Sequence, residues 1–384
     1  MRDDATQGDG GKEPGISSIF IFISGATLLV YSAERLIGYL VGASRHLKIS
    51  VFLLAIIFTG IEFDDIVLGV ALSLEGLEGV ALGLVLGTAV SFSGIVLALG
   101  GILAPTRVDI PTDYIIIFAA APLIMVAFAL TSSVTAAGAV VLLVLFAAWV
   151  AYVAVRESKR ETPIFRDLEV LEELTEPDAG TEAAGGGTAT LIRQDELVAT
   201  AVGSEPEGED REEAVAAMTP FHESRTLPGW ANLGLAVVAL AGIVIGAATM
   251  STGTEEILQR YGIQGTVFGA TFVTAVLALE DLFLTVQPIR KGVPEIGIGN
   301  VIGSLIFTVT GKLGIIVLAG GSIVVGSSVL RWHLPALLVI TGVAAYFLHT
   351  GQLKRWHGFA LLGLYIAYWV ISFAVYGGAP VEAD

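Results

Sequence analysis

The sequence predicts an all-α polytopic membrane protein with about ten transmembrane helices, arranged as two inverted five-helix repeats. Three observations support this fold class. The composition is apolar, with a mean hydropathy of +0.79, 54% hydrophobic residues and only 15% charged residues. Ten segments are long enough to cross a bilayer. An acidic motif in the first half recurs in the second, where Asp281 follows Asp65 by 216 positions.

The predicted spans follow from length and apolarity, because a helix needs roughly 20 mostly apolar residues to cross a bilayer. They are residues 17–40, 50–74, 79–103, 113–132, 134–155, 230–250, 264–287, 294–320, 329–348 and 357–377. Each half holds an odd number of spans, so the second half enters the membrane with reversed polarity. Two related halves of opposite orientation are typical of secondary transporters.

Composition divides the chain into five parts. They are a polar tail (1–15), a first membrane repeat (16–155), an acidic loop (156–228), a second membrane repeat (229–378) and a short tail (379–384). The acidic loop carries 18 Asp and Glu against 7 Lys and Arg. Its composition cannot bury a core, so we expect a mostly flexible tether; a regulatory, cation-sensing element is the alternative.

Basic residues predict the orientation, because cytoplasmic loops of membrane proteins are enriched in Lys and Arg. With an outside amino terminus, the outside connections carry few basic residues. The inside group is Arg45, Lys48, Arg107, Arg156, Lys159, Arg160, Arg290, Lys291, Lys354 and Arg355, and the outside group is Arg2, Lys12, Arg260 and Arg331. We therefore expect a cell-membrane protein with both termini outside and the acidic loop in the cytoplasm.

Acidic side chains interrupt two of the apolar segments: Glu62, Asp64 and Asp65 in the second, Glu280 and Asp281 in the seventh. A carboxylate near the bilayer centre costs at least ~2.5 kcal/mol, so such residues indicate a functional site. A purely structural buried network is the alternative, but it gives no reason to repeat the acids at a fixed offset.

These acids predict a cation site, because Ca²⁺ and Na⁺ bind oxygen ligands from carboxylates, hydroxyls and backbone. Asp65 and Asp281 are the principal candidates, with the neighbouring acids and the hydroxyls that end two Gly-rich stretches as auxiliary ligands. The predicted metal-binding residues are Asp65, Asp281, Glu62, Asp64, Glu280, Thr88 and Ser304. No cofactor is expected beyond the transported cations.

Lys312 lies inside the eighth predicted span, just over two helical turns beyond Ser304. An intramembrane ammonium normally pairs with a carboxylate or faces a cavity. We expect it to pair with an acid of the site, with Asp281 and Glu280 as the first candidates, and to modulate the charge of the site. The alternative is a side chain that extends to the membrane interface.

The repeated motifs resemble those of the cation/Ca²⁺ exchanger superfamily, which includes sodium/calcium exchangers. The family pattern is roughly G-T-S-x-P-E-L, then G-N-x-x-G-S-N. Here the first copy reads GIEFDDI from Gly60 and GLVLGTA from Gly83, and the second reads VLALEDL from Val276 and GNVIGSL from Gly299. The resemblance implies ten helices in two inverted repeats, and alternating-access exchange of Ca²⁺ against Na⁺ or H⁺.

Four kinds of position depart from the family pattern. The Glu is replaced by Asp65 and Asp281, the Pro by Asp64 and Glu280, and the final Asn by Ala89 and Leu305. The Thr-Ser pair is absent from both copies. Crowded carboxylates raise one another's pKa, so proton coupling or another divalent ion is an alternative to Na⁺-driven Ca²⁺ exchange.

The sequence therefore predicts a secondary cation antiporter and not an enzyme. A passive cation channel is the second reading, and an intramembrane aspartyl protease that uses two buried Asp is the third. The absence of cysteine excludes thiolate metal sites and cysteine nucleophiles. The chain has no basic patch for nucleic acid, and its expected partners are the lipid bilayer and inorganic cations.

Overall fold

A computed structural model describes residues 16–47, 62–157, 229–290 and 294–377, and confirms the all-α membrane architecture. Within these ranges, eight helices are long and apolar enough to cross a membrane, or nine if one bent helix pair counts as a span. The predicted span at 50–74 begins among residues outside these ranges, and its visible part is α3 (Phe63–Leu74). The acidic loop lies outside them as well.

The other elements lie close to the predicted spans, and four helices contain a π-helical turn, labelled η. In chain order they are α1 (Ile16–Leu47), α4 (Glu78–Ser91), η1 (Phe92–Val96), α5 (Leu97–Leu103), β1 (Thr106–Arg107), α6 (Thr112–Ala129), β2 (Ser133–Val134), α7 (Ala136–Glu157), α11 (Gly229–Tyr261), α12 (Gly265–Phe268), η2 (Gly269–Val273), α13 (Thr274–Arg290), α14 (Pro294–Phe307), η3 (Thr308–Lys312), α15 (Leu313–Gly320), β3 (Ile323–Val324), η4 (Val329–His333), α16 (Leu334–His349), β4 (Gln352–Leu353) and α17 (Arg355–Tyr376).

Two spans form the centre of the molecule. The continuous helices α4–η1–α5 and α14–η3–α15 are 94% and 89% buried over their most apolar windows, whereas the other six spans are 17% to 44% buried. A helix that is hydrophobic all round belongs in a core. The outer helices instead expose apolar side chains such as Ile116, Val144 and Val370, as expected for contact with lipid tails.

The two halves are related by an approximate two-fold symmetry, in which elements of one half correspond to elements of the other. The π-helical turns η1 and η3 begin at Phe92 and Thr308, which are 216 positions apart, the same offset that relates Asp65 to Asp281. The short strands follow the same symmetry. Strand β1 pairs with β4 and β2 pairs with β3, and both pairs are antiparallel. Each pairing joins the third-to-fourth connection of one half to the fourth-to-fifth connection of the other.

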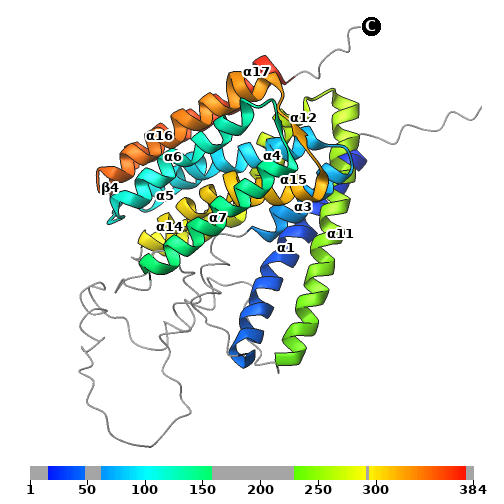
Figure 1. Cartoon of the computed structure of the whole chain (residues 1–384), viewed down its shortest axis with the longest axis horizontal. Helices are drawn as coiled ribbons and strands as arrows, with labels where there is room; N and C mark the ends of the chain where they lie inside the picture. The colour runs from blue at the N-terminus through cyan, green and yellow to red at the C-terminus, as the bar shows by residue number, and fades with distance from the viewer. Residues whose placement is uncertain (1–15, 48–61, 158–228, 291–293, 378–384) are drawn as a thin grey trace, which may run out of the picture.

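The long helices α1 and α11 pack against each other and extend beyond the rest of the bundle (Figure 1). Glycines permit this close approach. A Cβ built at Gly246 would lie 2.6 Å from the backbone nitrogen of Leu29, and one built at Gly25 would overlap the backbone of Met250. The two contacts mirror each other, and small residues are the usual means of close helix packing in membranes.

Helix α3 packs in parallel against η3 and α15, with residues spaced four apart on both sides. Three pairs face each other along this contact: Asp65 and Lys312, Gly69 and Ile316, and Ser73 and Gly320. The small members let the two helices approach closely. At the far end of α3, Glu75 accepts a 2.5 Å hydrogen bond from Ser251 of α11. Residues of the second half therefore hold both ends of α3.

The first acidic motif lies at the start of a helix, and the second lies at a bend within one. Helix α3 begins directly after Glu62, whose backbone is not helical (φ −81°, ψ 90°). In the second half, the helices Gly265–Leu279 and Asp281–Arg290 meet at an angle of 46°. The family's proline is thus not required for a bend at Glu280.

We predict that Gly246→Ala destabilises the protein, because the added methyl group overlaps the α1 backbone and overpacking typically costs about 1–3 kcal/mol. The measurement is thermal unfolding of the purified protein in detergent. Gly342→Ala is the matched control, since a Cβ at Gly342 on α16 meets nothing within 4 Å. Equal melting temperatures for the two variants would contradict the proposed close contact.

Candidate cation site at the centre of the bundle

The first-half acids lie at the beginning of α3. The carbonyl of Glu62 accepts a 3.1 Å hydrogen bond from the amide of Ile66, which closes the first helical turn. Asp64 and Asp65 follow in that turn and are 7% and 3% exposed. Acidic side chains are favourable at a helix amino terminus, because unpaired backbone N–H groups and the helix dipole attract negative charge. The motif therefore places its carboxylates where the backbone helps to stabilise them.

Lys312, the last residue of η3, is completely buried and forms ion pairs with Glu62 and Asp65. The alternative of a side chain that extends to the interface is wrong. The lysine was expected to pair with Asp281 or Glu280; the structure places Glu62 and Asp65 around its ammonium. The physical reason is the helix register, because the parallel packing of α3 on α15 brings the start of α3 to the end of η3.

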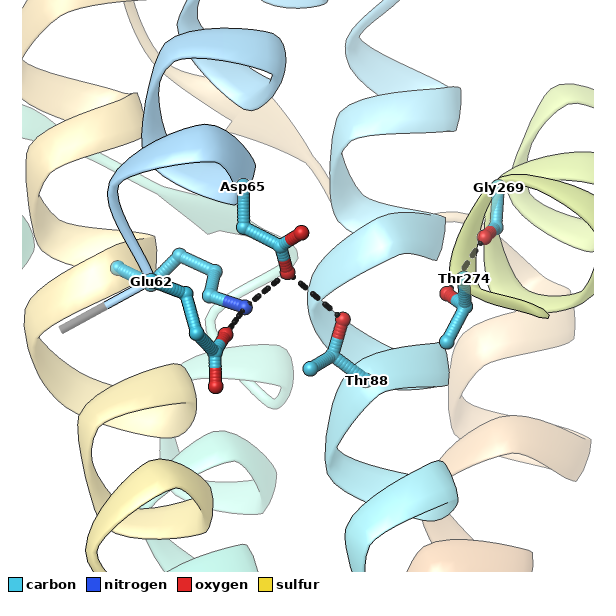
Figure 2. Close-up of polar contacts among 6 residues, drawn as sticks. Glu62, Asp65, Thr88, Gly269 and Thr274 are labelled. Carbon is cyan, nitrogen blue, oxygen red and sulfur yellow. Dashed lines mark hydrogen bonds and ion pairs between the residues drawn. The ribbon is translucent and has the colours of Figure 1, made fainter. Parts of the chain in front are cut away.

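Thr88 of α4 completes this cluster, as Figure 2 shows. Its hydroxyl donates a 3.1 Å hydrogen bond to Oδ2 of Asp65, the same oxygen that pairs with Lys312. Glu62, Asp65 and Thr88 thus converge from two helices of the first half on an ammonium from the second. On α4, Gly87 packs against Ala270 of η2 and Thr274, which hydrogen-bonds the carbonyl of Gly269 at 2.8 Å.

The second-half acids lie at the bend of α13. Asp281 is buried, with 9% of its surface exposed. The side chain of Glu280 lies outside the described residues. One turn after Asp281, the buried hydroxyl of Thr285 accepts a 3.4 Å hydrogen bond from the amide of Asn300. Buried polar groups of α13 and α14 therefore pair with each other one turn beyond the acidic motif.

Three polar residues follow one another along α14 and η3 at four-residue spacing: Ser304, Thr308 and Lys312. All three are at most 2% exposed. The hydroxyl of Thr308 and Oε1 of Glu62 are buried and find no hydrogen-bond partner among the described residues. Unpaired buried polar atoms are costly, so both point to a ligand. Thr308 is a site residue that the motifs did not predict, although its four-residue spacing from Ser304 and from Lys312 was the signal available.

The charge pattern determines what this centre can bind. Removing one partner of a buried ion pair typically costs about 3–5 kcal/mol, so Glu62 and Asp65 require a positive charge. Lys312 supplies it in this structure. Among the residues that the structure describes, no three acidic or histidine side chains are arranged to hold a metal ion. The predicted ligands Asp65, Glu62 and Thr88 come together, Asp64 is buried beside them on α3, and Asp281 and Ser304 are buried on α13 and α14 of the second half.

Comparisons with known proteins give a consistent result. Residues 231–374 match the model of the sodium/calcium exchanger protein family. The sodium/calcium exchanger MaX1 of Methanosarcina acetivorans is 33% identical over 143 residues, which cover 36% of this chain and 40% of that protein. The membrane protein MJ0091 of Methanocaldococcus jannaschii is 31% identical over 142 residues, or 35% of this chain and 43% of that protein. The chain thus spans under half the length of these relatives in the alignments.

The fold is similar over almost the whole chain to that of a solved exchanger. A structure of the sodium-calcium exchanger NCX_Mj, soaked with Na⁺ and Sr²⁺, aligns with a TM-score of 0.52 over 94% of this chain and 99% of that one, at 20% identity. The predicted resemblance to the cation/Ca²⁺ exchanger superfamily is confirmed. The exchanger architecture therefore surrounds a centre in which a lysine is paired with the motif acids.

We predict that Thr88→Val lowers the free energy of unfolding by about 1–3 kcal/mol, because it removes a hydrogen bond to a buried carboxylate. Thermal or denaturant unfolding of the detergent-solubilised protein measures the loss. Thr88→Ser retains the hydroxyl and should restore most of the stability. If Val and Ser variants are equally stable, the contact between Thr88 and Asp65 contributes nothing.

Proposed function

We propose that the protein is a secondary active cation antiporter that exchanges Ca²⁺ for Na⁺ or H⁺ by alternating access at its buried carboxylates. One observation carries the proposal: acids at equivalent positions of the two halves, Asp65 and Asp281, are both buried in the core. The exchanger names of the relatives and the fold shared with NCX_Mj support the same reading.

The oxygen chemistry supports a hard cation. Ca²⁺ binds six to eight oxygens and Na⁺ binds similar ligands with less charge. Carboxylates of α3 and α13, the hydroxyls of Thr88 and Ser304, and backbone freed at the helix interruptions are the oxygen sources in this core. Irregular backbone at membrane depth is tolerated only where it is buried in protein or lines a cavity.

Coupling follows from competition for one set of charges. Buried carboxylates without a counter-ion are unstable, so the empty site resists reorientation across the membrane. A cation bound from one side must then be replaced by a cation from the other. Repeats related by a two-fold exchange provide two similar arrangements, one open to each side. We place both termini outside and the acidic loop in the cytoplasm. Inward movement of Na⁺ or H⁺ then drives Ca²⁺ outward.

A passive channel would use the same carboxylates without coupling. It would conduct in the absence of any counter-ion gradient and would need a continuous polar path. The two central spans are instead 94% and 89% buried and apolar along most of their length. The burial of these spans favours an occluded site over an open pore.

We predict that Asp65→Asn and Asp281→Asn each abolish Na⁺- or H⁺-gradient-driven uptake of radioactive calcium by proteoliposomes. Asp281→Asn removes one charge and one strong oxygen ligand, and Asp65→Asn removes one of the two carboxylates that neutralise Lys312. Asp109→Asn is the control, because Asp109 is exposed in the connection after α5. Normal uptake by both site variants would refute the assignment, and calcium flux that needs no counter-ion gradient would indicate a channel.

A further inference from the structure

Lys312 breaks the two-fold relation between the halves. Its equivalent, 216 positions earlier, is Val96. Each of these residues ends a π-helical turn, η3 and η1 respectively, within a central span. Both are completely buried. One half of the site therefore receives an ammonium where the other half has an apolar side chain.

The surroundings of these two positions correspond as well. Helix α3 packs on α15, with Gly69 against Ile316, and α13 packs on α5, where a Cβ at Gly100 would lie 3.0 Å from Ile289. Asp281 begins the second part of α13, as Asp65 lies in the first turn of α3. The helices around Lys312 and Val96 thus pack in similar ways, and the two positions differ in the charge of the side chain.

The ammonium of Lys312 already holds the oxygens of the first half. It pairs with Oε2 of Glu62 and Oδ2 of Asp65, and Thr88 donates to that same Asp65 oxygen. An ammonium is a compact positive charge with three donors and no acceptor. In charge and in choice of partners it takes the place of a monovalent cation bound to these carboxylates.

We propose that Lys312 is a tethered cation that permanently occupies the first-half lobe of the carboxylate site, so that the mobile cation binds in the second-half lobe at Asp281. This inference rests on the proposed antiport function and specifies how the site is filled. The first-half lobe consists of Glu62, Asp65 and Thr88, and the second-half lobe lies around Asp281.

Two buried atoms beside the tethered ammonium remain available to a mobile ion. Oε1 of Glu62 and the hydroxyl of Thr308, one helical turn before Lys312, have no hydrogen-bond partner among the residues described. Glu62 thus contributes one oxygen to the tethered ammonium and keeps the other for the ion. The protein then binds one mobile positive charge fewer per cycle than a site with the same acids and no lysine.

The first test is equilibrium binding of radioactive Na⁺ to the purified protein in detergent, with choline keeping the ionic strength constant. Lys312→Met leaves Glu62 and Asp65 without their cation, and we expect it to bind an additional Na⁺ per molecule. Its melting temperature should also rise more steeply with Na⁺ than that of the wild type, because a ligand stabilises the state that binds it. Lys312→Arg keeps the charge and should bind as the wild type does. Equal Na⁺ stoichiometry in wild type and Lys312→Met would overturn the proposal.

The second test removes Asp65 and its cation together, so that the total charge of the site does not change and Glu62 is kept. The double variant Asp65→Asn, Lys312→Met should retain Ca²⁺-dependent stabilisation through Glu62 and the second-half lobe, whereas adding Asp281→Asn should abolish it. Loss of Ca²⁺-dependent stabilisation in the double variant would show that the mobile ion uses Asp65 and would refute the tethered-cation model. Failure of the proposed function has a different signature, since wild-type proteoliposomes would then show no gradient-driven exchange.

Discussion

The ion pairs of Lys312 with Glu62 and Asp65 are the interaction on which this structure depends. They join residues 247 and 250 positions apart, one from each half, at the centre of a bundle where unpaired charge is not tolerated. The remaining contacts of α3 are consistent with this pairing. Its small residues pack on α15, and its last turn is held by Ser251 of α11.

The two central spans explain how charges can lie so deep. Their π-helical turns widen the helix locally, and such turns often occur at functional sites. In η3 the widened turn carries Thr308 at its start and Lys312 at its end. Glycines on neighbouring helices bring the backbones close, so the polar groups find protein partners within a core that is otherwise apolar. The site is therefore a small cluster of polar side chains within an apolar core, and its stability depends on nearly complete pairing of its charges.

The approximate symmetry and its violation have different consequences. Matched π-helical turns, matched strand pairs and mirrored glycine contacts between α1 and α11 give the molecule two similar halves, as alternating access needs. The lysine is present in one half alone, opposite Val96 in the other. In the antiporter that we propose, a symmetric scaffold with an asymmetric charge distribution would keep alternating access while changing the number of ions bound.

The sequence by itself determined the membrane class, the positions of the buried acids and the relation between the halves. Apolar length and the 216-residue offset are properties of the chain that need no contacts to be read. The partners of Lys312, the role of Thr308 and the bend at Glu280 were decided by tertiary structure alone. They depend on the register between helices that are distant in the sequence, and a shift of one residue in that register would turn Lys312 toward different neighbours.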